Sequence, residues 1–173
     1  MFDYPLSGLV TLLTLLVFFW TAMRVGSARA KHQIKAPVHD GPEDFVRVLR
    51  VYANTHEMLV LFLPALWLCA LTISDFWAAL IGLLFPIGRV LYALGYYKAT
   101  EKRNRGFMIG FISTCALLLG AAIGLLHAAY AIYSKATKLS WVDIALLLAV
   151  IKFASEVVKS PGLNSRAHCR HQS

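Results

Sequence analysis

The sequence is poor in cysteine, and its three cysteines are far apart, at positions 69, 115 and 169 of 173 residues. This spacing provides neither a disulfide framework nor a cysteine-based zinc motif. Cys69 and Cys115 lie within apolar runs, where cysteine ordinarily behaves as a small buried hydrophobic residue. The short His168-Cys169-Arg170-His171 run has no partner motif, so we predict no metal site.

The chain also lacks the features of two other classes of protein. Its net charge is +8, but its cations are not interleaved with aromatic residues on a basic surface, so no nucleic-acid partner is predicted. Asp3 precedes the first apolar run and no Lys or Arg does, which is unlike a signal peptide. The chain is instead strongly apolar: 58% of its residues are hydrophobic and its mean hydropathy is +0.63. These values are typical of a polytopic helical membrane protein.

Apolar segments long enough to cross a membrane are separated by polar stretches. About 20 apolar residues in a helix span the hydrocarbon core of a bilayer. The segments predict an all-α membrane protein, a four-helix transmembrane bundle with an uncleaved first helix. The predicted helices are Leu6–Met23, a second from about Pro42 to Thr72 that contains Pro64, Phe76–Tyr97, and Phe107–Tyr133.

Two loops carry most of the cations near these helices. With four spans, the loops at 24–44 and 98–106 fall on one side of the membrane, which the positive-inside rule makes cytoplasmic. A compact core without an organelle signal favours a bacterial inner membrane, with a eukaryotic internal membrane as the alternative. The cations concerned are Arg24, Arg29, Lys31, Lys35, Lys98, Lys102, Arg103 and Arg105.

The C-terminal part is more ambiguous. In Trp141–Val158, the apolar run is interrupted by Asp143, Lys152 and Glu156, which favours an interfacial helix over a fifth span. We therefore divide the chain into a transmembrane domain (1–134), a C-terminal amphipathic or interfacial helix (135–159) and a flexible tail (160–173).

The second predicted helix begins with a polar stripe. Arg47, Arg50, Asn54 and Glu57 are spaced three, four and three residues apart, which places them on one helical face. A charge at bilayer depth costs about 2.5–3.5 kcal/mol, so such residues usually face a bundle interior and serve a function. The stripe predicts a polar pocket between helices, near one face of the membrane.

A second stripe lies on the third predicted helix. Arg89, Tyr92 and Tyr96 share a face, and Arg103 follows seven residues later, while Arg29 lies at the matching end of the first helix. Arginine recognises carboxylates bidentately, and a glutamate such as Glu57 can bind an ammonium group. The matching ligand is small and zwitterionic, with several carboxylates, and glutathione fits this description. The alternative is structural: interhelical ion pairs, among them Arg89 with Glu57.

These residues also form a pattern that resembles the MAPEG family, the membrane-associated proteins in eicosanoid and glutathione metabolism. The pattern extends over roughly Leu6 to Leu126. It consists of Arg47-x-x-Arg50-x-x-x-Asn54-x-x-Glu57, then Gly88-Arg89-x-x-Tyr92-x-x-Gly95-Tyr96, then Arg103-x-Arg105-Gly106-Phe107.

The resemblance implies a homotrimer of four-helix protomers with glutathione bound at the protomer interfaces. It implies a thiol-activating arginine just after the third helix, for which Arg103 is preferred and Arg105 is the alternative. Tyr52, Ala53 and Met58 depart from the residues of eicosanoid-synthesising members, which weakens any specific eicosanoid activity. The implied glutathione ligands are Arg29, Arg50, Asn54, Glu57, Arg89, Tyr92 and Tyr96.

We therefore predict an enzyme, a membrane glutathione transferase or glutathione peroxidase that attacks hydrophobic electrophiles arriving from the lipid. A cation beside a thiol favours the thiolate, which is the nucleophile. One thiolate serves conjugation, peroxide reduction or isomerisation, so the sequence leaves these open. The alternative is a non-catalytic lipid-binding protein of the same fold.

Overall fold

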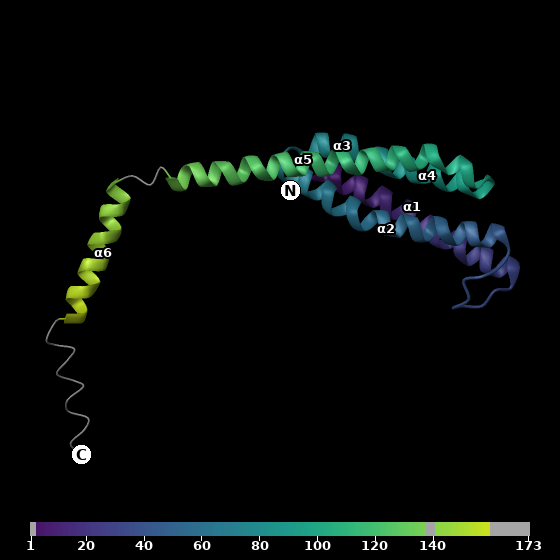
Figure 1. Ribbon diagram of the computed structural model, residues 1–173, viewed down its shortest axis with the longest axis horizontal. Helices are drawn as coiled ribbons and strands as arrows, with labels where there is room; N and C mark the ends of the chain where they lie inside the picture. The colour runs from purple at the N-terminus through teal and green to yellow at the C-terminus, as the bar shows by residue number, and fades with distance from the viewer. Residues whose placement is uncertain (1–2, 138–140, 160–173) are drawn as a thin grey trace, which may run out of the picture. The chain divides into compact units, whose positions relative to one another are not determined.

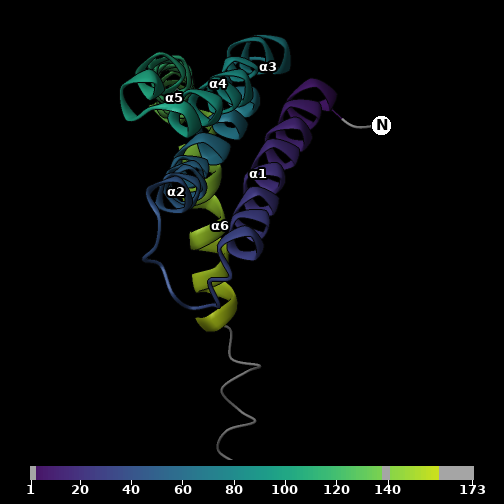
Figure 2. The ribbon, with the colours of Figure 1, turned by 90° about the vertical axis from the view of Figure 1, so that its right-hand side faces the viewer.

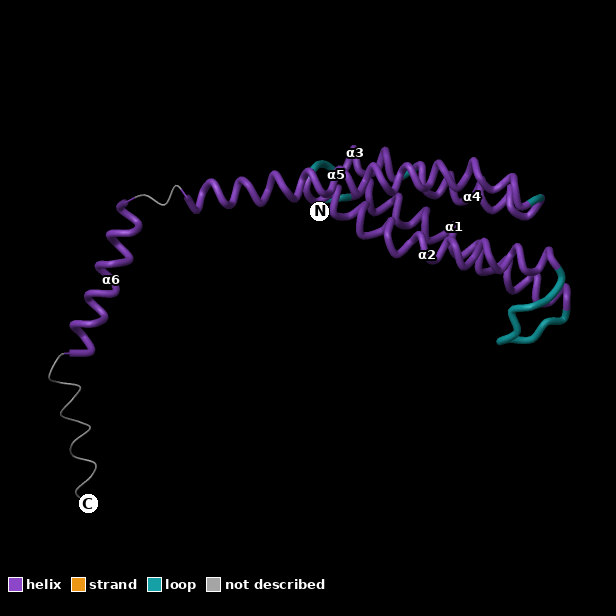
Figure 3. Tube along the Cα trace, in the orientation of Figure 1, coloured by secondary structure: helices purple, strands orange, loops and turns teal. Residues whose placement is uncertain are grey.

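The computed structural model describes residues 3–137 and 141–159, and these contain only helices and loops (Figures 1 and 3). Four helical stretches are long and apolar enough to cross a membrane, which agrees with the predicted bundle. The elements are α1 (Pro5–His32), α2 (Glu43–Thr72), α3 (Asp75–Gly82), α4 (Leu84–Lys98), the 3₁₀ turn η1 (Thr100–Arg103), α5 (Asn104–Thr137) and α6 (Trp141–Lys159).

Helix α1 continues nine residues beyond the predicted end at Met23, so the loop predicted at 24–44 is shorter than expected. The extension has a physical basis: Arg29, Lys31 and His32 lie in the last turn, where cations interact favourably with the helix dipole. Gln33 then ends the helix in a left-handed conformation, with φ of 55°.

The third predicted helix is continuous in the sequence pattern but divided in the structure. It breaks at Leu83, between α3 and α4. Pro86 explains the break, because a proline has no amide hydrogen and its ring crowds the preceding turn. The Ser113 hydroxyl on α5 donates a hydrogen bond of 2.8 Å to the carbonyl oxygen of Ile81 beside this break. Pro64, in contrast, lies within an unbroken α2.

Helix α1 is attached to the start of α3 by one carboxylate. The two oxygens of Asp75 accept hydrogen bonds from the backbone amides of Leu6 (2.9 Å) and Ser7 (2.8 Å). These amides belong to the first turn of α1, whose N–H groups have no partner within the helix. The first residue of α3 therefore also fixes the beginning of α1.

The main apolar core contains buried residues of α1 to α5, and within it the rings of Phe62 on α2 and Phe85 on α4 stack at a centroid distance of 3.9 Å. Figure 2 shows α4 between α1 and the first part of α5. Glycines permit the close contact between α4 and α5: a Cβ atom on Gly88 would lie 2.7 Å from the Gly110 nitrogen and 2.9 Å from the Gly106 oxygen. Neither backbone atom can move without displacing a helix.

The chain forms two compact units, Met1–Ala128 and Ala129–Ser173, and the division falls within α5. The domain boundary predicted at residue 134 lies in the same helix and stays a prediction. In the second unit, α6 contains a shorter apolar stretch, Ile144–Phe153, whose side chains are exposed. The predicted flexible tail, 160–173, lies outside the described residues.

Candidate functional site

The site is built around a hydrogen bond between the two polar stripes. The Asn54 side-chain amide on α2 donates to the Tyr92 hydroxyl on α4, with a distance of 2.6 Å. The stripes predicted from the sequence therefore meet, although 38 positions separate these residues. Tyr92 is buried, and it lines one hollow together with Asn54.

Arg89 lies beneath this pair and is 1% exposed. Its guanidinium carbon is 4.4 Å from the centre of the Tyr92 ring, and its Nη1 donates a long hydrogen bond of 3.4 Å to the Asn54 carbonyl oxygen. Among the described residues, its Nε and Nη2 have no hydrogen-bond partner. Arg89 thus holds both members of the pair through its charge and its contact with the ring face.

Arg103, the last residue of η1, lies over Tyr96. The distance from its guanidinium carbon to the ring centre is 5.2 Å, and its Nη1 donates a hydrogen bond of 3.3 Å to the Tyr96 hydroxyl. Tyr96 in turn packs against Tyr92, with 5.7 Å between ring centres. The turn η1 thereby places the Arg103 guanidinium against the polar stripe predicted on α4.

Two hollows meet at Asn54. One has a volume of about 260 Å³ and is lined by Asn54, Tyr92, Arg103, Asn104 and Phe107. The other has a volume of about 310 Å³ and is lined by His39, Asp40, Val46, Leu49, Arg50, Ala53, Asn54 and Glu57. The arrangement places a cation and two hydrogen-bonding side chains on one side of Asn54, with charges of both signs on the other.

Among the described residues, the polar stripe on α2 makes no ion pair with another helix. Arg50 and Glu57 are exposed on α2, and within the described ranges no ion pair joins Arg89 to Glu57. Arg47 is paired, but with Glu43 one turn earlier at 2.7 Å. Arg50 and Glu57 thus remain available to a ligand.

Two predicted residues lie apart from these hollows. Arg29 donates a hydrogen bond of 2.9 Å to the Val38 carbonyl oxygen, and its guanidinium lies 5.5 Å from the centre of the Phe45 ring. It supports the loop that carries His39 and Asp40, but lines neither hollow. Arg105, in the first turn of α5, is exposed and also lines neither hollow.

Three polar lining residues were not predicted from the sequence: His39, Asp40 and Asn104. The first two belong to the α1–α2 loop, and no periodic pattern could place that loop beside the first half of α2. Its position directly after the candidate arginine Arg103 was the one weak indication in the sequence that Asn104 lies at the site.

These features define a class: a helical membrane protein with an arginine- and tyrosine-lined polar site near the ends of its helices. The sequence model of the MAPEG family matches residues 7–123, and the chain belongs to this family. It is accordingly an integral, multi-pass membrane protein. The match includes every residue of the two stripes and both hollows.

Similar proteins come from bacteria and mammals. An uncharacterised protein of Synechocystis sp. is 45% identical over 119 residues, 69% of this chain and 87% of that protein. Microsomal glutathione S-transferase 2 of Mus musculus is 35% identical over 70% of this chain and 83% of its own. Leukotriene C4 synthase of Rattus norvegicus is 31% identical over 85% of this chain and 98% of its own.

Proposed function

We propose that this protein is a glutathione transferase, also able to act as a glutathione peroxidase, for hydrophobic electrophiles or hydroperoxides dissolved in the membrane. The observation that carries the proposal is the position of Asn54 between two hollows of complementary chemistry. The names of the two mammalian relatives, a glutathione S-transferase and a leukotriene C4 synthase, support the same class of activity.

The donor set suits glutathione group by group. Arg50 can hold a carboxylate and Glu57 the ammonium group, while the Asn54 amide can bind the peptide between them. With the tripeptide held in this way, the thiol of its central cysteine would lie toward Tyr92 and Arg103 in the second hollow. Arg89 is buried and lines neither hollow, so we assign it to positioning Asn54 and Tyr92.

Arg103 is the proposed thiol-activating residue. A guanidinium beside the thiol stabilises the thiolate and lowers the pKa of the thiol, while the proton is released to water. A lowering by one unit needs about 1.36 kcal/mol of differential interaction, which one partly desolvated arginine can supply. The contact with Tyr96 limits the positions that the Arg103 side chain can occupy. Arg105 remains the alternative from the sequence pattern.

A second copy of the chain is part of the proposal. The stripe on α2 faces outward, with Arg50, Ala53 and Glu57 exposed, so the hollow beside it is open on one side. Arg29 lines neither hollow of its own chain. A homotrimer with glutathione at its interfaces would close the open side and bring Arg29 of one protomer toward Asn54 of its neighbour.

The second substrate would reach the thiolate from the lipid, and the product could be a conjugate or a reduced peroxide. We propose a bacterial inner membrane as the location, with the glutathione site on the cytoplasmic side. The cations in the last turns of α1 and around η1 support this orientation.

The test compares two neighbouring arginine variants, Arg103→Ala and Arg105→Ala, in steady-state conjugation of glutathione to an activated aryl halide. Arg103→Ala is expected to lower kcat about tenfold or more and to change the KM for glutathione much less, because the thiolate is what it stabilises. Arg105→Ala is the matched control, with the same loss of charge two residues away.

Equal kinetic constants in the wild type and both variants would overturn the proposed thiol activation. A larger defect in Arg105→Ala would transfer the role to that residue. If the wild type binds glutathione or lipid without any turnover of aryl halide or hydroperoxide, the non-catalytic lipid-binding alternative replaces the enzyme.

A further inference from the structure

An apolar groove runs between α1 and α4, outside the candidate glutathione site. Two adjoining hollows of about 250 and 300 Å³ form it, and both are lined by Val17 and Val90. Apart from Trp20, every lining side chain is aliphatic. The other lining residues are Leu13, Pro86, Ile87 and Leu91 in the first hollow, and Leu16, Trp20 and Leu94 in the second.

Aromatic side chains mark one end of the groove. The Trp20 ring meets the edge of the Tyr97 ring at a centroid distance of 6.2 Å. The Arg24 guanidinium lies 5.4 Å from the centre of the same Tyr97 ring. Tryptophan and tyrosine prefer the boundary between hydrocarbon and headgroups, so this end of the groove corresponds to an interfacial depth.

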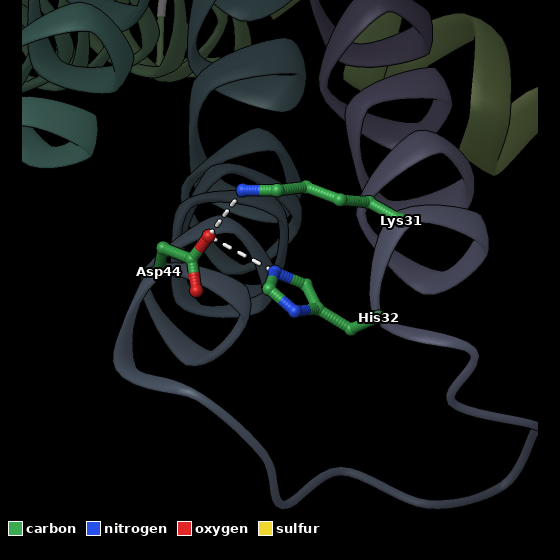
Figure 4. A network of polar contacts seen from close by, with 3 residues as sticks. All are labelled: Lys31, His32 and Asp44. Carbon is green, nitrogen blue, oxygen red and sulfur yellow. Dashed lines mark hydrogen bonds and ion pairs between the residues drawn. The ribbon is translucent and has the colours of Figure 1, made fainter.

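A basic hollow of about 200 Å³ lies beyond the aromatic pair. Its polar lining consists of Arg24, Ser27, Lys31, His32, Asp44 and Tyr97. Asp44 is its carboxylate, and Oδ2 of Asp44 already binds Lys31 Nζ at 2.8 Å and His32 Nε2 at 2.9 Å (Figure 4).

Arg24 is therefore the uncompensated charge in this hollow. None of the three ion pairs within residues 3–137 and 141–159 includes Arg24. The Tyr97 hydroxyl oxygen is buried, and the Arg24 guanidinium interacts with it from the same hollow. A guanidinium without an anionic partner, beside a hydroxyl in the same hollow, is suited to a phosphate oxygen.

We propose that this groove binds one anionic membrane phospholipid, with an acyl chain along α1 and α4 and the phosphate at Arg24 and Tyr97. Basic pockets between helices at a membrane face are suited to acidic lipid headgroups, and an aliphatic groove to acyl chains. From Leu13 to Arg24 a helix rises about 16 Å, which is long enough to accommodate most of an acyl chain below a headgroup.

The occupant differs from glutathione in both chemistry and position. Glutathione has no long apolar part, whereas this groove offers an aliphatic surface over two hollows. Tyr97 follows Tyr96 directly, but neighbouring residues on a helix point about 100° apart, so the two rings serve different faces of α4. None of Trp20, Arg24 and Tyr97 lines the hollows at Asn54.

The test uses the full chain in detergent and two lipids with identical acyl chains, phosphatidylglycerol and phosphatidylcholine. Native mass spectrometry measures the bound lipid, and thermal unfolding measures the stabilisation. Phosphatidylglycerol is expected to bind more tightly than phosphatidylcholine, and Arg24→Gln to weaken it about fivefold. Lys35→Gln is the matched control, because it removes one exposed cation from the α1–α2 loop without changing the hollow.

A second variant tests the acyl-chain part without changing charge. Val17→Phe partly fills both apolar hollows and should weaken the binding of both lipids, whereas Leu119→Phe, on an exposed position of α5, should weaken neither. Equal binding of the two lipids, or full discrimination in Arg24→Gln, would overturn the proposal. Equal stabilisation by glycerol phosphate alone would also overturn it, since the site would then recognise a soluble phosphate.

Discussion

The Asn54 side chain on α2 donates a 2.6 Å hydrogen bond to the Tyr92 hydroxyl on α4, and this contact joins the two polar stripes of the chain. Arg89 lies against both residues from within the core. The pair is thus fixed from one side by a buried cation and is accessible from the other through the hollows.

A double-mutant cycle tests this relationship. Asn54→Ala and Tyr92→Phe each remove one partner, and Tyr92→Phe retains the ring that contacts Arg89. Interhelical hydrogen bonds in membrane proteins contribute about 0.6 kcal/mol, so the coupling between the two substitutions should be of this size. The measurement is the free energy of unfolding of the four proteins in detergent. Strict additivity of the two effects would contradict the contact.

Gly106→Ala should separate α4 from α5. A Cβ atom at this position would overlap the Tyr92 backbone nitrogen and would lie 2.7 Å from the Gly88 carbonyl oxygen. Backbone atoms cannot give way, so we expect a loss of about 2 kcal/mol in unfolding free energy and a loss of conjugation activity. Gly8→Ala is the control: its Cβ would meet nothing within 4 Å, and it should be neutral or stabilising. Similar stability of both variants would be inconsistent with the close packing.

Asp75→Ala should loosen the beginning of α1. It removes a carboxylate that accepts hydrogen bonds from the Leu6 and Ser7 amides, and hydrogen bonds to charged groups contribute about 2 kcal/mol. We expect a loss of this size in unfolding free energy. Asp3→Ala removes an exposed carboxylate near the same helix end and should change stability by less than about 0.5 kcal/mol. If the two variants lose the same amount, the Asp75 contacts are not what holds α1.

Glu57→Gln should weaken the binding of glutathione about tenfold, because a charge-assisted contact with the ammonium group becomes a neutral one. Isothermal calorimetry with glutathione and with its deaminated analogue separates this effect from a general loss of structure. The analogue should bind the wild type and the variant equally. Glu156→Gln, on α6, is the matched charge control. An equal loss for both ligands would remove the assignment of Glu57 to the ammonium group.

Much of the fold could be predicted from the sequence, because hydropathy and length determine where a helix can cross a membrane. The predicted ends were less accurate. The extension of α1 to His32 depends on cations that continue a helix outside the membrane, where no hydrophobic pattern marks its end. The break at Leu83 depends on Pro86, whereas Pro64 leaves α2 unbroken. Two prolines in similar contexts thus had different effects that sequence alone does not distinguish.

For the candidate site too, helical spacing predicted which residues share a face but not how each residue is placed. Spacing placed Asn54 and Tyr92 on polar faces, and the hydrogen bond between them shows that these faces meet. Spacing could not show that Arg89 is buried beneath the site, because the same stripe would also suit a ligand-facing arginine. Nor could it place the α1–α2 loop, with His39 and Asp40, at the edge of a hollow. The assignment of the site to glutathione is still a prediction.

The most direct test of the central claim is the ultraviolet absorbance of thiolate during titration of the purified protein with glutathione. We expect saturable binding with a thiolate signal in the wild type, and binding without that signal in Arg103→Ala. The claim would be contradicted by saturable binding that produces no thiolate in the wild type, or by an undiminished signal in the variant.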